Sequence, residues 1–330
     1  MKKTFTLMQM LLAFIMLMGC SVNTVGAEGT NISLKTGGKM EVFRPAGDKS
    51  CGRAIIICPG GGYSYLSTEN EGTSWADYFN DLGYVVAVLK YRLPESKYDN
   101  RPFEDAQEAV LYLRRNSERF NIKNGCVGIM GFSAGGHVAS TLATHAGEGA
   151  EPDFQVLFYP VITMNPSYTH MGSHDCLLGV PPTDEAKLSV YQAKELYYSN
   201  EMHVTANTPP AFITYAADDT TVPIDNSKNY YDALLKNGVP AYIKEYPSGG
   251  HGFGWYKASF AYHDDLIAEL TSWLHSLDDL LPDGIAVPKA TETTHTTSMI
   301  YTLDGRPVGT SAKSLPCGIY ISGGKKICVK

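Results

Sequence analysis

The residues best suited to chemistry lie in the string Gly131-Phe-Ser-Ala-Gly-Gly-His137. It begins where the apolar run 126–130 ends, and the apolar helical segment 138–145 follows it. A Gly-x-Ser-x-Gly sequence between a strand and a helix is typical of a nucleophile elbow, a strained turn that presents the serine hydroxyl. The serine then stands at a helix N-terminus, where the dipole and free N–H groups favour developing negative charge. Ser133 is therefore the predicted nucleophile, and a serine that only caps the helix is the structural alternative.

A serine hydroxyl needs a base to take its proton, and the base needs a carboxylate to orient it. Both follow later in the chain, in the order serine, acid, histidine that is known for hydrolases built on an α/β sheet. The run 211–215 leads into Asp218 and Asp219, and the run 241–246 leads into the glycine-flanked His251. Asp219 is the predicted orienting carboxylate because its spacing fits a D-x-x-V-P pattern, and Asp218 is the alternative.

A run of three glycines after Pro59 directly follows the apolar run 53–58. Attack on an ester carbonyl creates an oxyanion, which backbone N–H groups stabilise by about 3 kcal/mol each. One donor is expected to be the N–H of Ala134, the residue after the nucleophile. Gly61 and Gly62 are the predicted partners, because PGGGY holds the position of the His-Gly-Gly-Gly motif of many esterases. Pro59 stands where that motif has its histidine.

Side chains beside these motifs are candidates for binding a substrate. Three aromatic residues could stack on sugar rings, with packing in the core as the alternative: Tyr63, Tyr65 and Trp255. His137 follows the elbow and is predicted to pack against the sheet. His170 and His174 stand four apart, but the string THMGSHD contains a glycine and predicts a loop, which disfavours a metal site. No pattern in the sequence requires a metal or another cofactor.

The elements that must position these residues are alternating strands and helices. Helical periodicity at 103–113 places apolar residues on one face. Runs rich in Val, Ile, Phe and Tyr occupy 53–58, 84–89, 126–130, 154–159, 211–215 and 241–246. This alternation predicts the α/β class, with a mostly parallel central sheet and helices on both faces. In such sheets the working residues collect at the carboxyl ends of the strands.

The two ends of the chain differ from this central part. Lys2-Lys3 and the apolar segment 8–18 have the features of a secretory signal, so residues 1–27 are predicted to be a signal peptide. Cleavage after Ala27 and a lipoprotein box that places a lipid anchor on Cys20 are alternatives. The catalytic domain is predicted over 28–280, a Thr- and Pro-rich linker over 281–297, and a small β module over 298–330.

Composition limits the classes of partner. The chain has 330 residues, a formal charge of -7 and a pI near 5.7, so it carries no basic footprint for nucleic acid. Four of the seven cysteines lack metal-ligand spacing and are predicted to be small core residues: Cys51, Cys58, Cys126 and Cys176. Cys317 and Cys328 are candidates for a disulfide in an oxidising compartment.

Taken together, the motifs resemble a known family. The ordered set is CPGGGY, EGTSWADYFNDLGYVVAVLKYRLP, GFSAGGH, YPVITM, LLG, TPPAFITYAADDTTVP and GGHGFG. It resembles the α/β-hydrolase esterases of the acetylxylan and feruloyl esterase group over roughly residues 40–278. The resemblance implies an α/β-hydrolase fold and removal of acetyl or feruloyl groups from hemicellulose through an acyl-Ser133 intermediate. His174 stands where relatives often carry arginine, which implies a difference in substrate recognition.

The C-terminal tail carries a separate resemblance. YTLDGR, GIYI and the final basic GKK segment resemble the sorting modules of the type IX secretion system. This implies a secretion machinery as partner, a secreted or cell-surface location, and cleavage after Ala27 rather than lipidation at Cys20. A periplasmic location is the alternative, and a carbohydrate-adhesive role is the alternative for the tail.

Three other functions stay open at this point. A prolyl-oligopeptidase-like peptidase shares the order of the triad, but no domain precedes residue 40 to restrict peptide access. A general short-chain carboxylesterase would use the same three residues. A substrate-binding protein without activity is disfavoured by the presence of Ser133, Asp219 and His251 together.

Overall fold

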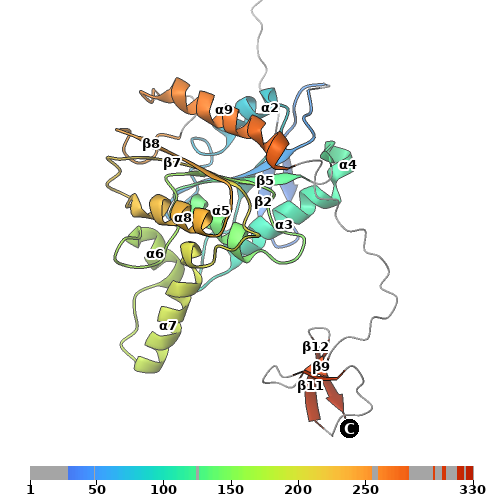
Figure 1. Cartoon of the computed structure of the whole chain (residues 1–330), viewed down its shortest axis with the longest axis vertical. Helices are drawn as coiled ribbons and strands as arrows, with labels where there is room; N and C mark the ends of the chain where they lie inside the picture. The colour runs from blue at the N-terminus through green and yellow to red at the C-terminus, as the bar shows by residue number, and fades with distance from the viewer. Residues whose placement is uncertain are drawn as a thin grey trace, which may run out of the picture. The chain divides into compact units, whose positions relative to one another are not determined.

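Six apolar segments of the chain form the parallel part of an eight-stranded sheet (Figure 1). They are β3 (Ala54–Cys58), β4 (Val85–Lys90), β5 (Val127–Phe132), β6 (Gln155–Phe158), β7 (Ala211–Ala216) and β8 (Ala241–Tyr246). Every residue of β3, β5, β6 and β7 is buried, since helices cover both faces of the sheet. The predicted α/β fold with a mostly parallel sheet and helices on both faces is confirmed.

The computed structural model describes residues 29–47, 49–123, 126–254 and 259–281, and four strands within 300–329. The chain forms two compact units, residues 1–285 and 286–330. The predicted signal peptide with Cys20 and most of the predicted linker lie outside the described residues. Within the described ranges, no helix combines the length and the apolar character needed to cross a membrane.

Two strands that the sequence did not predict extend the sheet at its N-terminal edge. β1 (Thr30–Ser33) and β2 (Lys39–Phe43) form an antiparallel pair, and β2 pairs antiparallel with β4. The order across the sheet is β1-β2-β4-β3-β5-β6-β7-β8. β1 buries one of its four residues, so its sequence lacks the continuous apolar run that marks the parallel strands.

Helices form one layer on each face of the sheet (Figure 1). One layer holds α2 (Ala76–Asp81), preceded by η1 (Thr73–Trp75), and α9 (His263–Leu280); the other holds α3 (Arg101–Arg115), α5 (Ala134–His145) and α8 (Asp225–Lys236), with α4 (Ser117–Phe120) after α3. Alternate residues of β3 belong to different cores: Ile55 and Ile57 lie in the core that also holds Leu270 of α9, while Ile56 and Cys58 lie in the core on the α5 side. Burying each large apolar side chain contributes about 1.5–3 kcal/mol.

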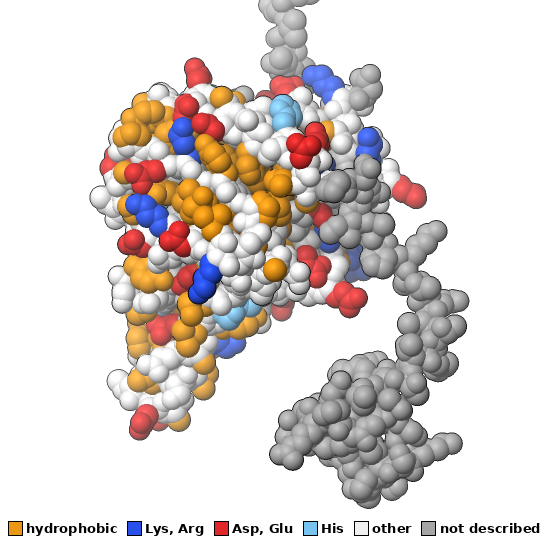
Figure 2. Space-filling model, viewed as in Figure 1, with side chains coloured by type: hydrophobic (Ala, Val, Ile, Leu, Met, Phe, Trp, Pro, Cys, Tyr) orange, Lys and Arg blue, Asp and Glu red, His pale blue; other side chains and the backbone are white. Residues whose placement is uncertain are grey.

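The connection between β6 and β7 is the longest excursion from the sheet. It contains α6 (Met171–Leu178), α7 (Glu185–Tyr197) and η3 (Asn200–Met202), and α7 projects away from the body in Figure 1. His174 of α6 is buried and meets Glu195 of α7 at 3.1 Å from its Nε2 atom. The apolar side chains visible on this projection in Figure 2 accord with the exposure of Val180, Val190 and Leu196.

The predicted loop around His170 and His174 is wrong, because this segment begins α6. His170 is the N-cap, and its Nδ1 atom accepts a hydrogen bond from the backbone N–H of Ser173. A capped first turn offsets the modest cost of Gly172 within a helix.

The C-terminal unit is a four-stranded sheet with the order β10-β9-β11-β12. Its strands are β9 (Ile300–Tyr301), β10 (Pro307–Gly309), β11 (Gly318–Ser322) and β12 (Lys325–Val329), and all pairings are antiparallel. The proposed pairing of Cys317 with Cys328 lies outside the described residues, since Cys317 is not among them.

Two of the four predicted core cysteines are exposed. Cys58 and Cys126 are buried, as predicted, whereas Cys51 and Cys176 are exposed free thiols. Cys51 lies in the loop before β3, and Cys176 lies on the exposed face of α6. The prediction is therefore wrong for these two residues.

Candidate active site

Ser133 stands in a strained turn between β5 and α5. Its backbone has φ +50° and ψ −121°, a conformation that a residue with a side chain rarely adopts. The backbone N–H of Ser133 donates to the carbonyl of Phe158 at 3.1 Å, and the N–H of Val161 donates to the carbonyl of Ser133 at 3.0 Å. The end of β6 thus holds the turn in place.

The glycines on either side of Ser133 are required by close approach of neighbouring backbone. A Cβ atom on Gly131 would lie against the carbonyl oxygen of Gly135, and one on Gly135 would lie against the carbonyl oxygen of Cys58. These contacts involve backbone atoms, which cannot move aside as a flexible side chain can. The Gly-x-Ser-x-Gly pattern therefore has a packing reason that goes beyond the turn itself.

The structure brings Ser133, His251 and Asp219 together although they are far apart in the chain. His251 Nε2 lies 2.9 Å from Ser133 Oγ, and His251 Nδ1 lies 2.7 Å from Asp219 Oδ2. An ionised carboxylate only accepts hydrogen bonds, so Nδ1 of neutral His251 carries the proton and Nε2 is free to accept one. The arrangement can move a proton from the serine hydroxyl to the imidazole.

Asp219 is held as an ionised acceptor. Its side chain is 1% exposed, and its Oδ1 atom accepts the backbone N–H groups of Thr221 at 2.8 Å and Val222 at 3.0 Å. Burial by itself raises the pKa of Asp219, but the hydrogen bond from His251 and the two N–H groups outweigh it, and the pKa lies below its ordinary value.

The alternative carboxylate, Asp218, has a different contact. It is exposed, and its Oδ1 atom accepts the backbone N–H of Gly250 at 2.7 Å. It therefore supports the loop that carries His251 and does not face the imidazole.

The glycine loop (Gly60–Gly62) lies directly against the nucleophile. A Cβ atom on Gly60 would lie 2.9 Å from Ser133 Cβ. Gly61 and Gly62 have φ values of +130° and +62°, which favour glycine. The N–H of Gly60 donates to Glu71 at 2.9 Å and is occupied, whereas the N–H groups of Gly61, Gly62 and Ala134 donate to no acceptor in the described part of the chain.

The aromatic candidates for substrate binding differ in how far their side chains are exposed. Tyr63 is 2% exposed, so its prediction as a sugar-stacking side chain is wrong. Its hydroxyl donates to His137 Nδ1 at 2.7 Å, while His137 Nε2–H donates to the carbonyl of Tyr198 at 2.8 Å. A φ of +61° accompanies this inward position of Tyr63. Tyr65 is 62% exposed, and Trp255 lies outside the described residues.

His137 takes the structural position that the sequence predicted. It is fully buried between the two tyrosine groups, and burial lowers its pKa to about 4. It therefore stays neutral near pH 7 and serves the core.

His170 is a residue near the site that sequence reasoning missed. A Cβ atom on Gly62 would lie 3.6 Å from His170 Cε1, so the imidazole stands beside the glycine loop. Burial lowers the pKa of His170, and the nearby His251 lowers it further. Its Nδ1 accepts from Ser173, which leaves the proton on Nε2. The feature of the sequence that could have indicated His170 was its position in the long segment between β6 and β7.

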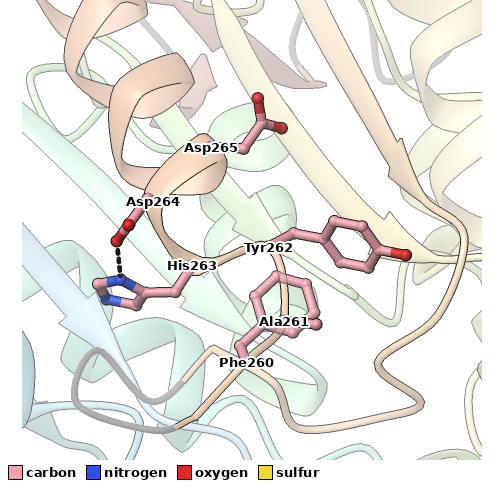
Figure 3. A pocket seen from close by; sticks show the side chains of 6 residues that line it. All are labelled: Phe260, Ala261, Tyr262, His263, Asp264 and Asp265. Carbon is pink, nitrogen blue, oxygen red and sulfur yellow. Dashed lines mark hydrogen bonds and ion pairs between the residues drawn. The ribbon is translucent and has the colours of Figure 1, made fainter.

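A hollow lies at the start of α9 (Figure 3). Its lining residues are Phe260, Ala261, Tyr262, His263, Asp264 and Asp265. Figure 3 shows the His263 and Asp264 side chains turned toward each other, with Nδ1 and Oδ1 3.1 Å apart. None of the triad residues lines it. Among the described residues, no group of three or more His, Cys, Asp or Glu is placed to hold a metal ion.

Comparisons with known proteins give concordant similarities. A family model described as the alpha/beta hydrolase fold matches residues 55–255. The chain is 36% identical over 275 residues to an acetylxylan esterase of Xylanibacter ruminicola, covering 83% of this chain and 56% of that protein. It is 36% identical over 212 residues to endo-1,4-beta-xylanase B of Butyrivibrio fibrisolvens, covering 60% of this chain and 32% of that protein. The chain thus spans about half or less of these curated relatives.

A solved structure gives the same similarity along its full length. The acetyl ester-xyloside bifunctional hydrolase from Caldicellulosiruptor lactoaceticus superposes with a TM-score of 0.66 at 29% sequence identity. The match covers 77% of this chain and 98% of that one.

Proposed function

The chain belongs to the α/β-hydrolase fold family, and we propose that it is a serine carboxylic ester hydrolase that removes acetyl groups from hemicellulose such as xylan. The observation that carries the reaction type is the continuous contact from Ser133 Oγ through His251 to Asp219, at 2.9 and 2.7 Å. Nucleophile, base and orienting carboxylate are the parts that acyl transfer to a serine needs.

The reaction proceeds in two halves. Ser133 Oγ attacks the ester carbonyl carbon while its proton passes to His251 Nε2, and a tetrahedral intermediate forms. His251 then gives that proton to the leaving sugar oxygen as the C–O bond breaks, which leaves an acyl-Ser133 ester. Water repeats the sequence, with His251 as base, and releases acetate. Asp219 holds the imidazole and stabilises its charged form.

The oxyanion is stabilised by backbone N–H groups. Those of Ala134, Gly61 and Gly62 are the donors in this proposal, because no described residue accepts a hydrogen bond from them. The N–H of Ala134 lies at the start of α5, where the helix dipole also favours negative charge. Such donors each contribute roughly 2.7–4 kcal/mol to stabilisation of the transition state.

The substrate class rests on similarity. The relative from Xylanibacter ruminicola is an acetylxylan esterase, and the other two proteins carry xylanase or xyloside in their names. Acetyl is the proposed acyl group, and feruloyl is the second acyl group that the assay must measure. Tyr65, exposed near the glycine loop, is available to a sugar ring.

The test uses the purified chain with acetylated, feruloylated arabinoxylan, and measures released acetate and ferulate. Acetate release by the wild type, lost in Ser133→Ala, is the expected result. Ser189→Ala is the matched control, since that hydroxyl lies on the exposed surface of α7 and, among the described residues, donates to the carbonyl of Glu185 in its own helix. Full activity of Ser133→Ala would refute the triad. Cleavage of synthetic acetate esters without acetate release from the polysaccharide would refute the substrate.

Export is part of the same proposal. The basic and apolar N-terminus would act as a signal peptide, and the tail would act as a sorting module, which gives a secreted or cell-surface enzyme. Deletion of residues 282–330 is expected to abolish secretion and to leave ester hydrolysis intact. Retained secretion with lost binding to insoluble polysaccharide would instead make the tail an adhesive module.

A further inference from the structure

A carboxylate that the triad does not use lies behind the glycine loop. Glu71 is 7% exposed, and its hydrogen-bond partners among the described residues are a backbone N–H and a hydroxyl rather than a cation. Each of its oxygens accepts one hydrogen bond: Oε2 from the backbone N–H of Gly60 at 2.9 Å, and Oε1 from the hydroxyl of Tyr159 at 2.8 Å. Burying a carboxylate without a cation is costly, so its position next to the site calls for a reason.

Glu71 fixes the first residue of the glycine loop. Its bond to the N–H of Gly60 spans eleven residues of chain, and a Cβ atom on Gly60 would lie 2.6 Å from Glu71 Oε2. On the other side of the loop, the hydroxyl of Tyr91 donates to the carbonyl of Pro59 at 2.7 Å. The peptide before the oxyanion donors is thus held from both directions.

Tyr159 extends this support to the loop that carries the base. Its hydroxyl donates to Glu71 and accepts the N–H of Gly254 at 3.1 Å. Its ring meets the imidazole of His251 edge-on, with centroids 4.7 Å apart. Tyr159 has a φ of +36°, a strained value at the end of β6. A chain of contacts therefore joins Gly60 to the His251 loop through Glu71.

The same contacts explain how the glycine loop is supported although its motif has no histidine. Pro59 has neither an N–H nor a polar side chain. The support comes instead from a residue that follows the loop in sequence and returns to bind its backbone.

We propose that Glu71 is a positioning residue that holds the Gly60–Gly62 loop so that the N–H groups of Gly61 and Gly62 meet the developing oxyanion. The inference rests on the proposed function, because it assigns a role to a residue behind the same site. Glu71 does not touch the substrate. Its contribution is confined to the transition state, where the geometry of the oxyanion donors matters most.

Glu71→Ala tests the inference with p-nitrophenyl acetate as the substrate. Loss of one oxyanion donor lowers kcat about 100-fold or more, and we expect a fall of that order with KM changed less than about threefold. The affinity for an alkylboronic acid, which adds to Ser133 as a tetrahedral analogue, should fall in parallel. Glu71→Gln keeps one carbonyl acceptor for Gly60 and should restore about tenfold of the lost kcat. Glu69→Ala is the matched control, an exposed carboxylate two residues away.

A merely structural role gives a different pattern. It would lower the melting temperature of Glu71→Ala and leave kcat and boronic acid affinity within threefold of the wild type, which overturns the inference. If Glu71→Ala does not fold, Glu71→Gln and Tyr159→Phe decide, and wild-type kcat in both overturns it. Activity retained in Ser133→Ala, or no ester cleavage by the wild type, instead overturns the proposed function and the inference with it.

Discussion

The replacement Asp219→Asn should nearly abolish catalysis while leaving the fold intact. Oδ1 of Asp219 accepts two backbone N–H groups, and Oδ2 accepts His251. An asparagine in this place keeps its single carbonyl oxygen on Thr221 and Val222, so its NH₂ group faces His251 Nδ1. Since an NH₂ group only donates, the imidazole proton must move to Nε2, the atom that has to accept the proton of Ser133.

The magnitude follows from this change of tautomer. The contact is 2.7 Å long and the carboxylate is 1% exposed, so water cannot take its place. In serine hydrolases the wrong tautomer lowers kcat by about 10⁴. At 1.36 kcal/mol for each factor of ten, this corresponds to about 5.4 kcal/mol of lost transition-state stabilisation.

The assay compares two adjacent carboxylates. Steady-state hydrolysis of p-nitrophenyl acetate is measured for the wild type, Asp219→Asn and Asp218→Asn. The second variant should keep kcat within about threefold, because the asparagine oxygen still accepts the N–H of Gly250. A kcat of Asp219→Asn within tenfold of the wild type would refute the reasoning, as would equal losses in both variants.

Three further predictions concern buried polar groups. Tyr63→Phe leaves His137 Nδ1 without its donor and should lower the free energy of unfolding by about 1–3 kcal/mol in urea titrations, with KM for xylan unchanged. A raised KM at unchanged stability would instead show that Tyr63 binds the sugar. The folded-state pKa of His137 is about 4, so below about pH 6.5 the unfolded chain binds more protons than the folded chain. The free energy of unfolding should therefore fall by up to about 3 kcal/mol as the pH drops toward 4. His137→Gln should reduce this dependence on pH, and an equal dependence in both proteins would contradict the assignment. Asp105 is fully buried and accepts both the backbone N–H and the guanidinium of Arg92, so Asp105→Ala should lower the free energy of unfolding by about 3 kcal/mol. Glu104 is an exposed partner of Arg92, so Glu104→Ala should lower it by less than about 1 kcal/mol, and equal losses in both variants would be the contrary result.

Local signals in the sequence determined the architecture and two of the three triad residues. Strands that are buried on both sides must be apolar throughout, so β3, β5 and β7 were recognisable without their neighbours. Ser133 and His251 stand next to glycines in turns after strands, and such turns depend on residues close by in the chain. β1 lacked this signal because three of its four residues are exposed, and β2 lacked it because Lys39 and Glu41 interrupt its apolar residues.

The tertiary structure decided where individual side chains point. Asp218 and Asp219 are neighbours of the same type, and only the path of the backbone after β7 directs the second toward His251. Tyr63 and Tyr65 are also close in the chain and of the same type. Tyr63 has a positive φ and lies in the core, whereas Tyr65 is exposed.

Glu71 shows most clearly which residues of the site could not be predicted from the sequence. Its partner Tyr159 is 88 residues away, and no local pattern distinguishes its carboxylate from that of exposed Glu69. The type and order of elements depend on interactions between near neighbours, which the sequence displays. The direction of a polar side chain depends on which distant segments pack around it, and only the folded chain brings those segments together.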